Sequence, residues 1–274
     1  MKLSVAVAGE QALHSAFVVF RGFEQSIIQA STLGYDGVEL ALKSPEDCDV
    51  HAISSLLEEQ GMEISCISTG QVSADLGYSF SDEDIQRRRS LISLFREMID
   101  IGQLFHAPVN VGRVRGSIGD RDGEQVETLF MESMQEVGSY AQKRGVTLLI
   151  EPVNRYEIDF INSVEEGSQI LQKINLPNIL LMPDVFHMNI EDRSIEGSLE
   201  AYIDQIGYVH LADSNRHAPG WGHLDFRNIL TTLKSVGYDG WTSVEVLPVP
   251  DPFAAARQAA DHILGLMREL DLRT

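Results

Sequence analysis

The sequence predicts a (β/α)8 barrel, an α/β fold in which parallel strands and helices alternate, and two observations carry this prediction. Eight short apolar runs rich in β-branched residues recur along the 274 residues, and a longer amphipathic stretch follows each run. The runs show little polar alternation, as is typical of strands in a parallel sheet that helices cover. Eight such units match the roughly 250 residues of a closed barrel.

The elements follow one another without interruption. The expected strands, in chain order, are Leu3–Ala8, Gly37–Leu42, Glu63–Thr69, Val109–Val114, Thr147–Val153, Ile179–Val185, Tyr208–Ala212 and Trp241–Val246. The expected helices between them are Glu24–Leu33, Val50–Gln60, Asp84–Leu104, Glu124–Arg144, Val164–Ile174, Leu199–Ile206, Phe226–Val236 and Ala254–Leu270. This alternation indicates βαβ units and one domain over residues 1–274. An open doubly wound sheet is the alternative, but Ala8-Gly9-Glu10-Gln11 is not the glycine-rich turn that usually follows its first strand.

The composition argues against several classes of partner. There are 41 acidic and 21 basic side chains, so the net charge is -20 at pH 7. Nucleic acid is not an expected partner, because phosphate backbones are bound by clustered Lys and Arg. Cys48 and Cys66 provide no disulfide framework, and no signal-like segment or membrane-length apolar run is present. We therefore expect a cytoplasmic protein without a nucleic-acid or membrane partner.

Four consecutive expected strands carry, near their carboxyl ends, a residue that a buried strand rarely accommodates: Glu151, Asp184, His210 and Glu245. Active sites of such barrels lie at that end of the strands. One such residue alone would more often cap a helix or join an ion pair, but four in succession favour a metal site. Three carboxylates and one imidazole suit Mn²⁺, Mg²⁺ or Co²⁺, whereas Zn²⁺ more often draws additional His or Cys. The sequence therefore predicts a divalent-metal site, with Mn²⁺ as the first expectation.

The segments around these residues resemble the xylose isomerase-like TIM barrel superfamily, which includes sugar phosphate isomerases and epimerases. The strings that carry the resemblance are Glu151-Pro152-Val153-Asn154-Arg155-Tyr156-Glu157, Asp184-Val185-Phe186-His187-Met188-Asn189 and His210-Leu211-Ala212-Asp213-Ser214-Asn215-Arg216. Within the superfamily they are most similar to the D-tagatose and D-psicose (allulose) 3-epimerases. The resemblance covers nearly the whole chain and is densest from Thr147 to Leu247.

The resemblance implies an isomerase of carbohydrate metabolism that acts on a small sugar, as a homodimer or a homotetramer. It implies that the four strand-end residues bind the metal, and that Glu157, His187 and Arg216 contact the hydroxyls and carbonyl at one end of the sugar. In the expected reaction one carboxylate removes the C3 proton of a ketose, leaving a metal-stabilised cis-enediolate, and a second returns a proton on the opposite face. Glu151 and Glu245 suit these two catalytic roles.

One loop departs from the sugar epimerases. Arg113 and Arg115, near the end of the fourth expected strand, are candidates to bind a phosphate or carboxylate of the substrate. Ion pairing with acidic neighbours explains them equally well. The sequence thus leaves open whether the sugar carries an anionic group. Glu39, in the second expected strand, is a candidate to support the metal site from behind its ligands.

Other activities of the same superfamily stay open. A lyase similar to inosose dehydratase would use the same metal and enolate but expel water. A sugar-phosphate or hydroxypyruvate isomerase would return the proton to a different carbon. A hydrolase resembling endonuclease IV would need several more His ligands and a basic face, which eight His and a net charge of -20 do not favour. A non-catalytic sugar-binding barrel would be expected to lack one of the two Glu ligands.

Overall fold

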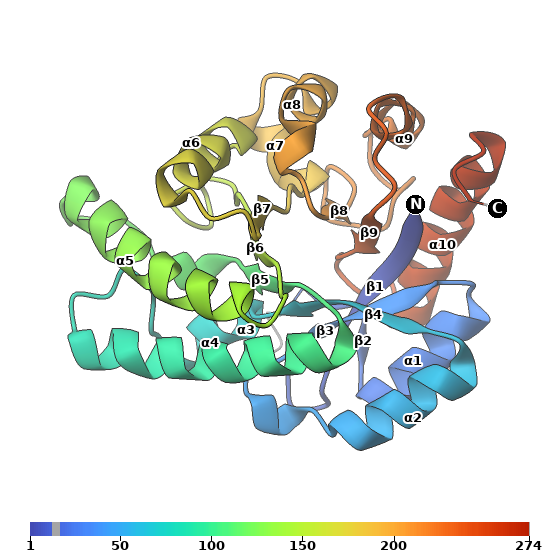
Figure 1. Ribbon diagram of the computed structural model, residues 1–274. Helices are drawn as coiled ribbons and strands as arrows, with labels where there is room; N and C mark the ends of the chain where they lie inside the picture. Colours follow the sequence, from blue (N-terminus) through green and yellow to red (C-terminus); the bar gives the residue numbers. More distant parts are fainter. Residues whose placement is uncertain (13–16, 274) are drawn as a thin grey trace.

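The computed structural model describes residues 1–12 and 17–273, and it confirms the predicted (β/α)8 barrel. Its strands are all parallel and follow the order β7-β6-β5-β4-β3-β1-β9-β8, with the short β2 paired to β1 beside this path (Figure 1). The strand bounds are β1 (Lys2–Ala8), β2 (Phe20–Arg21), β3 (Gly37–Ala41), β4 (Glu63–Ser68), β5 (Val109–Val111), β6 (Leu148–Ile150), β7 (Ile179–Leu181), β8 (Val209–Leu211) and β9 (Trp241–Val244).

The sheet closes between β7 and β8 through two isolated parallel bridges, Leu181 with Ile206 and Asp184 with His210. The backbone N–H of Gly207 donates to Leu181 at 2.9 Å, and that of His210 donates to Pro183 at 2.9 Å. The second bridge sets two of the expected metal ligands side by side on neighbouring chain segments. Closure of the barrel therefore contributes directly to assembly of the site.

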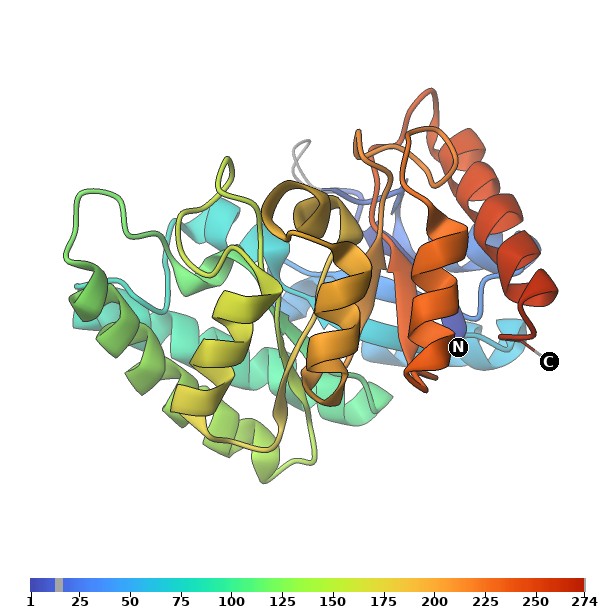
Figure 2. The same cartoon turned by 90° about the horizontal axis from the view of Figure 1, so that it is seen from above.

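The helices form a layer outside the strands, as the view from above shows (Figure 2). Their bounds are α1 (Phe23–Thr32), α2 (Val50–Gln60), α3 (Gly70–Leu76), α4 (Ile85–Phe105), α5 (Gly123–Gln142), α6 (Val164–Ile174), α7 (Val185–Glu191), α8 (Ile195–Tyr202), α9 (Phe226–Ser235) and α10 (Pro252–Glu269), with 3-10 turns η1 (Pro45–Asp47), η2 (Arg113–Arg115) and η3 (Ile203–Gln205). Eight of the helices that the structure describes begin at a side-chain cap that binds a free N–H of the first turn. These caps are Asp49, Asp84, Asp122, Ser163, Asp184, Ser194, Asp225 and Asp251.

All expected strands except the first are shorter than predicted, and in two of them the chain enters a helical turn soon after it leaves the sheet. The fourth barrel strand ends at Val111, and Arg113–Arg115 form the turn η2 instead of continuing it. The sixth ends at Leu181, and α7 begins at Val185 with Asp184 as its cap. Pro183 has no N–H to donate to a neighbouring strand, which favours the early end. The short helices α3 and α7 lie outside the helices that the sequence predicts.

The described core has three parts, because side chains of a strand alternate between the helical layer and the barrel interior. A large apolar cluster lies between strands and helices, a small one inside the barrel consists of Cys66, Leu149, Met182 and Tyr208, and another small one consists of Ala6, Ala8, Val18 and Ala41. Burial, together with the charges of Glu39 and Glu151, raises the pKa of the Cys66 thiol. Cys66 is therefore an unreactive core residue.

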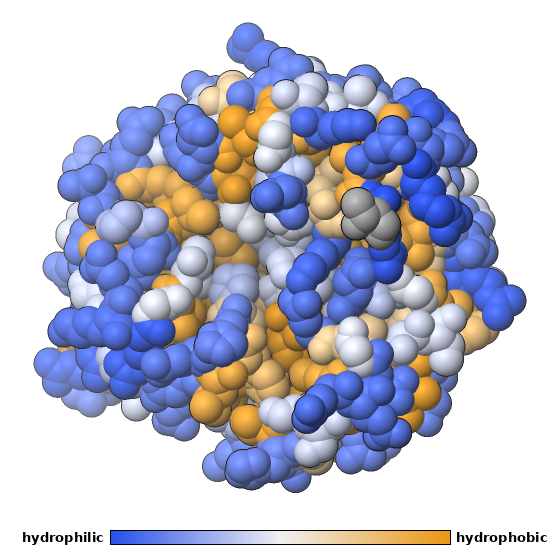
Figure 3. Space-filling view, turned by 45° about the vertical axis from the view of Figure 1, so that its right-hand side comes forward, coloured by the Kyte–Doolittle hydropathy of each residue, from blue (hydrophilic) through white to orange (hydrophobic). Residues whose placement is uncertain are grey.

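Hydrophilic side chains cover most of the face shown in Figure 3, and the surface is hollowed near its centre. Within the described part of the chain, no helix is long and apolar enough to span a membrane.

Candidate metal centre

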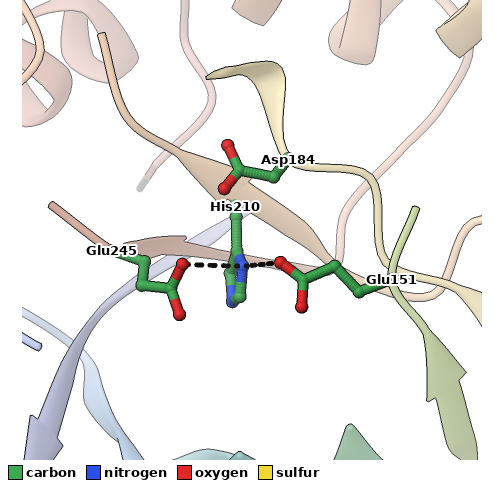
Figure 4. A group of neighbouring side chains, drawn as sticks. All are labelled: Glu151, Asp184, His210 and Glu245. Atoms are coloured by element: carbon green, nitrogen blue, oxygen red, sulfur yellow. Dashed lines mark hydrogen bonds and ion pairs between the residues drawn. The ribbon is translucent and has the colours of Figure 1, made fainter. Parts of the chain in front are cut away.

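The barrel brings the four expected ligands together at the carboxyl ends of its strands. Glu151 follows β6, Asp184 follows β7, His210 lies in β8 and Glu245 follows β9. One potential ligand atom from each residue lies within 4.8 Å of all the others. Figure 4 shows Asp184 above the His210 ring and the two glutamates approaching it from opposite sides. Asp184 and His210 are fully buried, and buried carboxylates need positive charge beside them, which a metal ion could supply.

The His210 ring has a defined orientation within this group. Its Nδ1 atom lies 3.3 Å from Glu151 Oε1 and 3.8 Å from Glu245 Oε2. Its Nε2 atom points the other way and lies 3.0 Å from Glu39 Oε2. Nδ1 is therefore the nitrogen that a metal between the glutamates could use.

Asp184 has two separate partners, one for each carboxylate oxygen. Its Oδ1 accepts from the Phe186 N–H at 2.8 Å and caps α7. Its Oδ2 accepts from Arg216 Nη1 at 2.6 Å, and the other arm of Arg216 pairs with Glu245. The guanidinium lies against the rings of Phe17 and Phe186, with its carbon 4.7 and 4.8 Å from their centroids. Arg216 is thus a buried, immobilised cation that links two of the expected ligands.

The two glutamates differ in proton affinity. Burial and the charges of Glu151 and Glu39 raise the pKa of Glu245 to about 8, against the opposing charges of His210 and Arg216. Burial also acts to raise the pKa of Glu151, but the hydrogen bond and charge of His210, with the charges of His187 and Arg216, outweigh it and lower that pKa to about 2. In the metal-free protein, Glu151 is therefore ionised near neutral pH while Glu245 holds a proton. The two carboxyl groups titrate as a pair.

The residues that the resemblance assigned to the sugar lie beside this group. Glu157, His187 and Arg216 all line the same pocket. Asn154 connects them, because its Nδ2 donates to Glu157 Oε1 at 3.1 Å and lies 2.7 Å from His187 Nδ1. Burial lowers the pKa of His187 to about 4, so its ring is neutral and can both accept and donate hydrogen bonds.

Arg113 and Arg115, in the loop after β5, point to different parts of the structure. Arg113 lines the pocket, with its Nη1 atom 4.0 Å from Glu157 Oε2. Arg115 is fully buried, and it donates to the carbonyl oxygens of Phe160, Gly112 and Ile161 at 2.6, 2.9 and 3.0 Å. The structure does not bring Arg115 into the pocket, because the turn η2 directs it toward the loop after β6. Its guanidinium ties the two loops together.

The sequence did not single out Asn110, although it supports Glu151. Asn110 is buried in β5, and its Nδ2 donates to Glu151 Oε2 at 3.2 Å. Asn110 could have been found in the same way as the metal ligands, because it is a polar residue in an otherwise apolar expected strand. Asn154 gave no such signal, because polar residues are ordinary in a loop. Ser68 at the end of β4, and Gly70 and Gln71 in α3, also line the pocket.

Comparison with known proteins finds a matching family and several similar epimerases. The family model described as xylose isomerase-like TIM barrel matches residues 27–268. The chain is 30% identical to an L-ribulose 3-epimerase of a Methylomonas species over 226 residues, which are 80% of this chain and 76% of the relative. It is 26% identical to a D-psicose 3-epimerase of Ruminiclostridium cellulolyticum over 235 residues, 81% of this chain and 78% of the relative. The crystal structure of a 3-keto-D-glucoside 4-epimerase from Escherichia coli superimposes with a TM-score of 0.81 at 20% identity, covering 98% of this chain and 99% of that one.

Proposed function

The chain belongs to the xylose isomerase-like TIM barrel family, and from this premise we propose that it is a divalent-metal-dependent ketose 3-epimerase. It is an isomerase that acts on carbohydrates, as its relatives among the sugar epimerases indicate. The observation that carries the proposal is the pair Glu151 and Glu245, which approach one point from opposite sides with unequal proton affinities. Inversion of a carbon needs a base on one face and an acid on the other.

Four residues would hold the metal: Glu151, Asp184, His210 and Glu245. They fit a divalent cation because their ligand atoms converge within 4.8 Å, in a buried site whose charge is mostly negative. Three carboxylates and one imidazole favour Mn²⁺, with Mg²⁺, Co²⁺ and Zn²⁺ as alternatives. When bound, the metal supplies Lewis acidity that polarises the ketose carbonyl and makes the proton on the adjacent carbon more acidic.

In the proposed reaction, different residues act as base, as acid and as binding groups for the sugar. The Glu151 carboxylate accepts the C3 proton, and Asn110 holds that carboxylate in position by donating to its Oε2 atom. The Glu245 carboxyl group donates a proton from the other face, so C3 is inverted. Glu157, His187 and Arg216 bind the oxygens at the reacting end of the sugar and fix which carbon lies between the two glutamates. Burial of Asp184, His210 and Arg216 keeps water away from these three side chains.

Arg113 is the residue that we propose to set the class of sugar. Its guanidinium faces the pocket, and its ion pair with Glu157 is long at 4.0 Å, so it can bind a phosphate or carboxylate of the substrate. Arg115 has no such role in the proposal, because its donors are used by three backbone carbonyls.

The test uses protein loaded with Mn²⁺ and a panel of ketoses, ketose phosphates and inososes in D2O. Deuterium at C3 of a ketose would support the proposal. Exchange with transfer of the carbonyl would indicate an aldose–ketose or hydroxypyruvate-type isomerase instead. Loss of water from an inosose, with turnover of no ketose, would reject epimerisation in favour of a lyase. Repeating the assay after chelation and reloading with Mg²⁺, Co²⁺ or Zn²⁺ identifies the preferred ion.

The role of the base is tested by Glu151→Gln, which keeps the shape of the side chain. Isotope exchange should vanish while the melting temperature of the metal-free protein stays close to that of the wild type. Glu63→Gln is a matched control, because Glu63 is exposed at the amino end of β4, away from the pocket. Exchange that persists in Glu151→Gln would show that another group removes the proton. The dimer or tetramer and the cytoplasmic location stay predictions.

A further inference from the structure

A buried polar chain lies inside the barrel beneath the metal centre, where an apolar core would be expected. It runs from His210 through Glu39 and Tyr208 to Ser65 and Ser4, and every one of these residues is fully buried. The residues come from β8, β3, β4 and β1, with Tyr208 immediately before β8. A carboxylate and a ring of hydroxyls inside a barrel cost free energy unless each group is bonded, so their presence calls for a role.

Glu39 meets the side of the His210 ring that faces away from the other carboxylates. Its Oε2 and Oε1 atoms lie 3.0 and 3.2 Å from His210 Nε2. Because a carboxylate only accepts, Nε2 carries a proton. A metal would therefore bind the lone pair of Nδ1, the nitrogen between Glu151 and Glu245, once Nδ1 has released its own proton. Glu39 is not a member of the converging ligand group itself.

Glu39 is in turn held by Tyr208. The phenol hydroxyl donates to Glu39 Oε2 at 3.1 Å, and this uses its only proton. The phenol oxygen lies 2.7 Å from Ser65 Oγ and 3.0 Å from Ser4 Oγ, so a serine hydroxyl donates to it. The two serines also bond to each other at 2.8 Å. This series of hydrogen bonds therefore anchors the Glu39 carboxylate of β3 to the two strands beside it, β1 and β4.

We propose that Glu39, fixed by Tyr208, is a positioning residue that selects the Nε2–H tautomer of His210 and aims Nδ1 at the metal. This rests on the proposed function, since it concerns the same metal. Histidine ligands commonly donate their second N–H to a carboxylate, and loss of such a partner typically weakens metal binding by about 10- to 100-fold. Glu39 acts without touching the metal or the sugar.

The experiment measures Mn²⁺ affinity by the electron paramagnetic resonance signal of the free ion, at fixed pH, in the wild type and variants. Glu39→Ala is expected to weaken binding about 100-fold, and Tyr208→Phe, which removes only the hydroxyl, about 10-fold. Glu39→Gln should lose less than Glu39→Ala, because its amide oxygen still accepts from Nε2. Cys66→Ala is the matched control, since Cys66 packs in the same interior cluster as Tyr208. It should change stability and leave the affinity as it is.

The tautomer of the His210 ring gives a second readout. In protein with 15N-labelled histidine and saturating Mg²⁺, two-bond proton–nitrogen correlation spectra should show the Nε2–H form of His210 in the wild type, with His210→Asn supplying the assignment. Glu39→Ala should give a mixture of tautomers. An unchanged tautomer, or Mn²⁺ affinity within about twofold of the wild type in Glu39→Ala, would overturn the role of Glu39. Absence of Mn²⁺ binding by the wild-type protein would instead overturn the metal site, and the inference with it.

Discussion

Replacement of Gly112 by alanine places one methyl group against the expected catalytic base. Gly112 lies between β5 and the turn η2, and a Cβ atom built on it would be 3.1 Å from Glu151 Oε2 and 3.1 Å from Asn110 Oδ1. These contacts are tighter than ordinary van der Waals contact, so Glu151 and Asn110 must move apart or away from the loop. The same carboxylate oxygen accepts the hydrogen bond of Asn110. Gly112→Ala should therefore displace Glu151 by a few tenths of an ångström.

The expected magnitude follows from that displacement. A misplacement of about 1 Å in an active site can reduce the rate about 100-fold, so a few tenths of an ångström should reduce kcat by about 3- to 10-fold. A tenfold loss corresponds to about 1.4 kcal/mol in the activation barrier. The substrate oxygens bound by Glu157 and His187 are not touched, so KM should change less than kcat.

The assay is deuterium exchange at C3 by Mn²⁺-loaded protein, with kcat and KM measured separately. Gly265→Ala provides the control, because a Cβ at this position in α10 meets nothing within 4 Å. Alanine there should keep full activity and raise stability by about 0.5–1 kcal/mol. A kcat for Gly112→Ala within about twofold of the wild type would refute the argument that Glu151 is held at its place by this close approach.

Three further predictions concern the arginines and the pH dependence. Arg113→Gln should raise KM about tenfold for ketose phosphates or carboxylates and leave that of neutral ketoses nearly unchanged; equal effects on both classes would exclude an anion-binding role. Arg115→Gln should instead lower the free energy of unfolding by about 3 kcal/mol in a urea titration, because buried carbonyls lose their donors; stability equal to that of Arg113→Gln would contradict the buried role. In metal-free protein the raised pKa of Glu245 means that the native state holds a proton that the unfolded chain releases, so this group stabilises fully below about pH 4.5 and its contribution is lost as pH rises to about 8. The slope of unfolding free energy against pH in this window should flatten in Glu245→Gln, and an unchanged slope would show that Glu245 is not the group responsible.

The backbone of the fold was predictable because its signals are local. Each barrel strand is a short apolar run and each outer helix an amphipathic one, so residues near in sequence were enough to place them. The exceptions lie where the chain leaves the sheet. Helix α7 has only seven residues, and it begins directly after its cap Asp184, a residue that the apolar pattern predicts to be in a strand. A run this short carries too little periodicity to be separated from a strand end.

Around the site, the sequence alone identified the four converging side chains, because a charged residue at the end of a buried strand conflicts with its surroundings wherever the strand lies. It could not tell Arg113 from Arg115, since their difference comes from a turn that sends one toward the pocket and the other toward carbonyl oxygens more than forty residues away. Nor could it show which nitrogen of His210 is free. That depends on Glu39, 171 positions away in the chain, and only closure of the barrel brings the two together. Local pattern determined the strands and the ligand types, whereas orientation and partnership came from contacts that exist only in the folded barrel.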